Sequence, residues 1–245
     1  MSYNKLKKYE SLVDAYRELY GDDAFNYVKG VEVTKEIISL SKELEQNYEN
    51  KTRSANNYYS PLMEAIRLFF KSQRCIIEVS NQLFMMELND SLFSFVDKIS
   101  LNKIQFGNMI LDTASVHGTQ KIKEAFSKAL EHIKPILPEL ETALKKVSEA
   151  KDQDLVSVLG GGVNILKAKI SFFNSLVAVL EKNFRKAVQY LEESVQYLES
   201  AIKHVNTNLD TSGEVENAKK TEAYLKLLIN NYRASINTIK KHVSS

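Results

Sequence analysis

The side chains that could do chemistry in this chain are few and widely spaced. Its four histidines are His117, His132, His204 and His242. No two of them stand at the spacing with which a helix binds a metal ion, and no Glu-x-x-His pattern of a carboxylate-bridged di-iron bundle occurs. We therefore expect each histidine to be a surface side chain, and we expect no metal site and no cofactor.

One cysteine and one glycine triplet are the other candidates for a catalytic or phosphate-binding site. Cys75 precedes Ile76 and Ile77 in an apolar helical pattern, which favours a buried, inert thiol over a nucleophile. Gly160-Gly161-Gly162 lacks the Lys-Ser or Lys-Thr of a phosphate-binding loop, and we interpret it as a break or hinge in a helix. We therefore predict a protein that is not an enzyme.

The composition is that of a globular protein made mainly of helices. Apolar residues make up 44% and charged residues 26%, while 8 Gly and 3 Pro leave few turn residues for a many-stranded fold. The 33 basic and 31 acidic side chains are too balanced for a nucleic-acid-binding face. One cysteine and the lack of a signal-peptide core predict a cytoplasmic protein. No uninterrupted apolar run approaches the roughly 20 residues that cross a bilayer.

Apolar residues at steps of three and four predict a single all-α domain over residues 1–245. We expect a short helix in residues 1–23, an elongated antiparallel bundle of long amphipathic helices in 24–205, and an extra helix in 214–243. The first three helices of the bundle are expected from Ala24 to Glu49, from Ser60-Pro61 through Ile99, and from Lys121 to Val147 with a kink at Pro135 and Pro138. The apolar pattern weakens near residues 112–119, where the chain should turn.

The longest apolar pattern runs from Val163 to Val205 and has nearly the period of a coiled coil. It predicts one continuous helix, about 60 Å long at ~1.5 Å per residue. Such a helix makes an elongated molecule. The residues expected to form the seam within the bundle or between two subunits are Phe173, Val177, Leu180, Phe184, Val188, Leu191, Val195 and Leu198.

Lysines concentrate around the expected turn and in the helix after it. Lysines clustered at one end of an elongated body can bind anionic lipid headgroups, each contributing ~1 kcal/mol near the surface. A solvated helix face is the alternative, because Glu124, Glu131, Glu139 and Glu141 are interleaved with them. The candidate membrane-binding residues are Lys98, Lys103, Lys121, Lys123, Lys128, Lys134, Lys145 and Lys146.

Two stretches resemble helices of the BAR (Bin/amphiphysin/Rvs) family of membrane-curving dimers. QLFMMELNDSLFSFVDKI, Gln82–Ile99, is similar to the middle helix, and ISFFNSLVAVLEKNFRKAVQYLEESVQYLESAI, Ile170–Ile202, is similar to the last. The resemblance implies a crescent-shaped homodimer with a six-helix core, whose lysines bind an anionic membrane and whose Lys121, Lys123 and Lys128 lie near a tip. The implied function is binding or curving of membranes by a peripheral cytoplasmic protein.

A second resemblance leaves another class of function open. NFRKAVQYLEESVQYLESAI, Asn183–Ile202, is similar to the second helix of a tetratricopeptide-type hairpin. Such hairpins stack into grooves that bind peptides. The alternative function is therefore a helical scaffold or adaptor that binds protein partners.

Overall fold

The apolar residues at helical spacing form eight helices in the described part of the chain. The computed structural model describes residues 2–19, 27–55, 60–90, 103–106, 109–112, 116–149, 153–209 and 215–243. The all-α class is confirmed, with one short hairpin added. The helices are α1 (Ser2–Leu19), α2 (Tyr27–Ser54), α3 (Ser60–Asp90), α4 (Val116–Ile133), α5 (Ile136–Glu149), α6 (Gln153–Leu180), α7 (Phe184–Leu209) and α8 (Val215–Val243).

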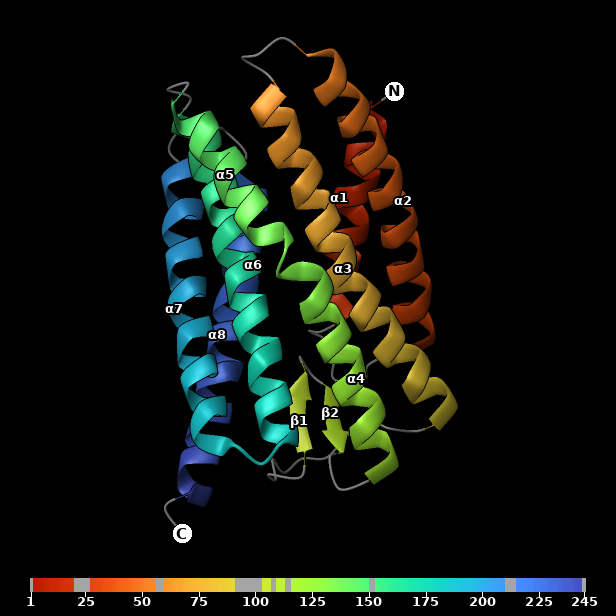
Figure 1. The fold of residues 1–245 in the computed structure, drawn as a ribbon, viewed down its shortest axis with the longest axis vertical. Coiled ribbons are helices and arrows are strands. Elements are labelled where there is room, and N and C mark those ends of the chain that lie inside the picture. Colours follow the sequence, from red (N-terminus) through yellow and green to blue (C-terminus); the bar gives the residue numbers. More distant parts are fainter. Residues whose placement is uncertain are drawn as a thin grey trace.

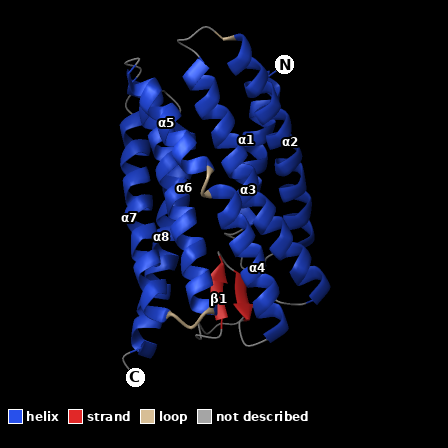
Figure 2. Ribbon diagram, viewed as in Figure 1, coloured by secondary structure: helices blue, strands red, loops and turns tan. Residues whose placement is uncertain are grey.

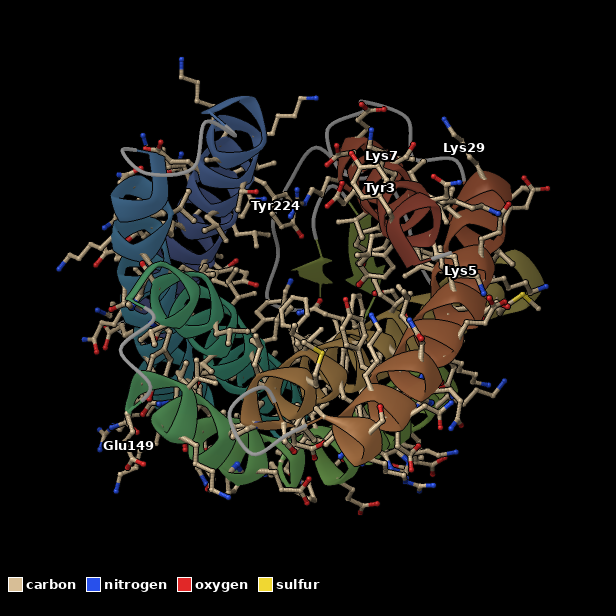
Figure 3. The ribbon with its side chains drawn as sticks, turned by 90° about the horizontal axis from the view of Figure 1, so that it is seen from above. Tyr3, Lys5, Lys7, Lys29, Glu149 and Tyr224 are labelled. Atoms are coloured by element: carbon tan, nitrogen blue, oxygen red, sulfur yellow. The ribbon has the colours of Figure 1, made fainter. Side chains whose placement is uncertain are left out.

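The helices run along one long axis in two groups (Figure 1). Helices α1, α2 and α3 lie together on one side, and α6, α7 and α8 lie together on the other. Helices α4 and α5 pack on both α3 and α6 and so join the two groups along one side. Seen from above, α1 and α8 border the opposite side (Figure 3). The break between α4 and α5 falls at Lys134-Pro135, where the sequence predicts a kink.

Polar contacts that are buried or partly buried hold the first group together. The Tyr16 hydroxyl of α1 and the Ser80 hydroxyl of α3 lie 2.8 Å apart. Asn81 of α3 donates to the Thr34 hydroxyl of α2 over 2.8 Å, and Arg74 of α3 donates to Glu45 of α2, also over 2.8 Å. Because these groups are wholly or partly removed from water, leaving one of them without its partner would cost stability, and the contacts therefore favour one register of the three helices.

The described part of the third helix, α3, ends at Asp90. We expected this helix to run through Ile99, and residues 91–99 of that prediction lie outside the described residues. Strands β1 (Lys103–Phe106) and β2 (Met109–Asp112) pair antiparallel, in a hairpin that we did not predict from the sequence (Figure 2). The two residues between them in the sequence are Gly107-Asn108, a pair that favours a two-residue hairpin.

The single helix predicted from Val163 to Val205 is also wrong, because α6 and α7 are two helices packed side by side (Figure 1). Lys182 has a left-handed backbone with φ of 59°. The Asn183 side chain accepts a hydrogen bond from the Lys186 N–H over 3.2 Å, which caps the start of α7. The predicted seam is therefore divided, with Phe173, Val177 and Leu180 on α6 and Phe184, Val188, Leu191, Val195 and Leu198 on α7.

The glycine triplet does not interrupt the helix, which corrects the predicted break. Helix α6 runs without interruption from Gln153 through all three glycines. A β-carbon on Gly160 would lie 3.1 Å from the His204 ring of α7, and one on Gly162 would lie 3.0 Å from the Phe69 ring of α3. The glycines therefore allow α7 and α3 to approach the backbone of α6 closely.

We predict that Gly161→Ala stabilises the protein, whereas Gly161→Leu destabilises it. A β-carbon at Gly161 would meet His204 at 3.4 Å, an ordinary contact, so alanine should gain about 0.5–1 kcal/mol of helix propensity. Leucine must displace α7 and should cost about 1–3 kcal/mol. Urea unfolding followed by circular dichroism measures both values. Equal stability of the two variants would contradict the packing of α7 on this position.

Candidate functional site

The structure disperses the predicted membrane-binding lysines over several elements. Lys98 lies outside the described residues, and Lys103 lies on β1. The remaining six lie on α4, on α5 and in the turn between them. The Lys123 ammonium is 2.8 Å from Glu181 in an ion pair. Lys128, Lys134, Lys145 and Lys146 are exposed, with exposed glutamates on the same two helices.

The other residues considered for chemistry do not come together. Cys75 is buried, and burial raises the pKa of its thiol. His132 is exposed as predicted, whereas His204 is half-buried against the α6 glycines. The side chains of His117 and His242 lie outside the described set. Within the residues that the structure describes, no cluster of three or more His, Cys, Asp or Glu side chains could hold a metal ion.

The structure does form a groove that the sequence did not predict. A recess of about 310 Å³ lies where α1, α3, α6 and α8 meet. Its apolar surface comes from all four helices, and Glu10, Asp14 and Arg17 of α1 and Lys169 of α6 supply its charged groups. We call this recess the α1–α8 groove; its apolar and aromatic lining residues are Tyr9, Val13, Tyr16, Phe69, Ile76, Ile77, Ile165, Tyr224 and Leu225.

Aromatic side chains of the groove are fixed by their neighbours. The Tyr9 ring packs edge to face on Phe70, with centroids 5.1 Å apart. The Tyr16 hydroxyl is already bonded to Ser80. These rings therefore offer rigid apolar surface, while Val13 and Ile165 are half-buried and remain accessible to a ligand.

Arg17 connects the two helices that border the groove. Its guanidinium donates to Asp14 over 3.2 Å and lies 5.4 Å from the centre of the Tyr224 ring. The second contact joins α1 to α8, and Figure 3 shows Tyr224 on the inner side of α8. Stacking of Tyr232 on Phe172, with centroids 4.5 Å apart, holds α8 against α6.

A second recess, of about 450 Å³, lies between the end of α2, the start of α3 and α5. Thr52, Ser60, Glu64, Glu139 and Lys146 contribute much of its lining. It joins fewer apolar side chains than the α1–α8 groove, so it offers less surface for the hydrophobic effect.

Sequence reasoning missed the groove because its walls are far apart in the chain. From the sequence we predicted α1 as a short helix before the bundle, and α8 as an extra helix after it. The available signal is compositional, since Tyr9, Tyr16 and Tyr224 place phenol rings on the apolar faces of both end helices. That signal does not say that the two faces meet.

Comparison with protein-family models, with curated proteins and with solved structures finds no match to this chain. One helical segment in the described residues, Leu159–Leu180, is long and apolar enough to cross a membrane by composition. Core helices of soluble proteins pass the same test, and this segment is the C-terminal part of α6, half of which is buried in the bundle.

We predict that Tyr9→Phe reduces the loss of stability at high pH. Burial raises the Tyr9 pKa to about 12 in the folded protein, against about 10 in the unfolded chain. The folded state therefore holds this proton more tightly, and the stability linked to it is present below pH 10 and is lost as pH rises to 12.

Unfolding in urea at pH 9 and pH 11.5 measures the effect. The wild-type protein should lose on the order of 2 kcal/mol more than Tyr9→Phe over this interval. Tyr9→Phe differs from the wild type by one hydroxyl, so the difference between the two proteins isolates the ionisation of that group. An equal pH dependence in Tyr9→Phe and wild type would refute the assignment.

Proposed function

We propose that the protein is a non-enzymatic helical scaffold, and that an amphipathic helix of a protein partner packs into the α1–α8 groove. The observation that carries this proposal is that two helices from the two groups border one apolar recess. A helix placed between α1 and α8 buries its apolar face on α3 and α6 in the way that the helices of this bundle bury theirs on one another.

The distribution of apolar side chains supports the groove over the rest of the surface. In the described residues, the large apolar side chains that are exposed are Tyr3, Val28 and Leu227, on three different helices. They form no continuous patch, whereas the groove gathers half-buried apolar residues from four helices. A volume of about 310 Å³ suits the few anchoring side chains that a docked helix inserts.

We predict that Val13→Glu abolishes partner binding. The new carboxylate would enter the apolar groove and would have to be desolvated when a partner helix packs there. Val28→Glu is the matched control, because Val28 is 57% exposed on α2 and outside the groove lining. A partner protein captured by the wild type is purified and mixed with each purified variant, and calorimetry measures the binding.

Hydrogen exchange on the reconstituted complex locates the partner-binding site. We expect slower exchange in α1 and α8, and unchanged circular dichroism for both variants in the absence of partner. Loss of binding in Val28→Glu together with retention in Val13→Glu would reject the groove as the docking site.

Membrane binding is the second candidate, favoured by the exposed lysines of α4 and α5. Lys128, Lys134, Lys145 and Lys146 make no ion pair with a described residue. They belong to the helices on the side opposite the opening between α1 and α8 (Figure 3). A BAR-like homodimer that presents these lysines to an anionic membrane, as a peripheral cytoplasmic protein, stays a prediction of the sequence.

We predict that the double variant Lys128→Glu/Lys134→Glu weakens binding to phosphatidylserine vesicles by at least on the order of tenfold, if this second function operates. Lys35→Glu/Lys42→Glu, on exposed positions of α2, changes net charge equally and is the control. Vesicle sedimentation at low and physiological salt measures both, and light scattering reports whether the protein is a dimer. Equal binding by the two variants would exclude α4 and α5 as the membrane-facing side.

A further inference from the structure

Lys169 is the cationic side chain that α6 contributes to the groove. It is half-buried, one turn after Ile165, in a recess that also contains Phe69 and Leu225. Lys167, two residues earlier, makes an ion pair with Glu141 of α5 at 2.7 Å. The two lysines of the same helix thus face different surroundings, one with a carboxylate and one in the apolar groove.

The other charged groups of the groove are already occupied or lie in water. Asp14 accepts a hydrogen bond from Arg17, and Arg17 also packs over Tyr224. Glu10 is exposed on α1. Lys169 makes no ion pair with any residue that the structure describes. An ammonium in a partly apolar recess has lost part of its hydration, so a carboxylate placed beside it gains more than one placed beside an exposed charge.

We infer that Lys169 makes the α1–α8 groove selective for an acidic amphipathic helix, one whose apolar anchors are accompanied by a carboxylate that binds the Lys169 ammonium. This inference rests on the proposed function, because it assumes that the groove receives a partner helix. A glutamate or aspartate three or four positions from an apolar anchor lies on the same face of a helix and can reach both features of the groove.

The Lys169 charge also fixes the position of the partner helix along the groove. Apolar packing alone tolerates sliding of a helix along a groove, whereas one carboxylate opposite one lysine sets a single position. The exposed Glu10 on the α1 wall opposes a second acidic group at that wall and favours a basic one. The partner helix therefore carries its acidic group on the side that faces α6.

The test uses octanoate, octan-1-ol and octylammonium as probes that share one apolar chain and differ in head group. Binding to the full-length protein is followed by NMR shifts and calorimetry below the concentrations at which the probes aggregate. We expect octanoate to bind on the order of tenfold more tightly than octanol, and octylammonium to bind most weakly.

Two variants isolate the charge from the apolar stem. Lys169→Met keeps an unbranched apolar side chain and should remove the advantage of octanoate while leaving octanol binding unchanged. Lys167→Met, on the same helix and paired outside the groove, should keep that advantage. Circular dichroism and urea unfolding confirm that both variants are folded.

The outcomes separate this inference from the proposed function. Equal binding of octanoate and octanol to the wild type would overturn the role of Lys169 and leave the apolar groove intact. Tightest binding of octylammonium would overturn it as well, in favour of Glu10 and Asp14. Binding of none of the probes would count against the groove itself and against both proposals.

A mutation in the captured partner tests whether the groove binds a helix or a small carboxylate ligand. Replacing the acidic residue of its docking helix by the corresponding amide should weaken binding to the wild type and have no effect with Lys169→Met, which is a double-mutant cycle. Octanoate selectivity without such coupling would show that the groove takes a small amphiphile, and the helix part of the inference would be wrong.

Discussion

The fold depends on the packing of α6, whose described side chains are all buried or half-buried. Helices α3, α4, α5 and α7 all pack on it, and the Phe172–Tyr232 stack adds α8. At roughly 25 cal/mol per Å² of apolar surface, a helix without exposed side chains among those described supplies a large share of the hydrophobic stabilisation. The glycines at 160–162 extend this packing, since they let His204 and Phe69 approach the α6 backbone. The two helical groups are therefore held to one shared element.

The local properties of the chain could be predicted from its sequence. The helical spacing of apolar residues, the helix start at Ser60-Pro61 and the interruption at Pro135 all follow from interactions within a few residues. The separation of α6 from α7 could not be found in this way. Leu180 and Phe184 keep helical spacing across the turn, because both helices direct apolar residues to the same core. Only Asn183, as a capping residue, marks the boundary, and its signal is weaker than the periodicity around it.

The glycine triplet at 160–162 shows why the predicted helix break was wrong and why the groove was not predicted. The same lack of a β-carbon that weakens an isolated helix permits close contact between packed helices, and the neighbours decide which effect matters. Gly160 and Gly162 were interpreted from the first property, and they act through the second. The α1–α8 groove likewise depends on tertiary neighbours, because it forms only where helices from opposite ends of the sequence lie near each other. No local pattern around Tyr9 or Tyr224 reports that proximity.

The order of the groove walls along the chain has a consequence for biosynthesis. During translation α1, α3 and α6 emerge in turn, and the wall that contains Tyr224 is made after all of them. Until α8 is made, the recess therefore has walls from α1, α3 and α6 and is open on the α8 side. The complete groove is thus a property of the finished polypeptide, because a chain that ends before α8 lacks the wall formed by Thr221, Tyr224 and Leu225.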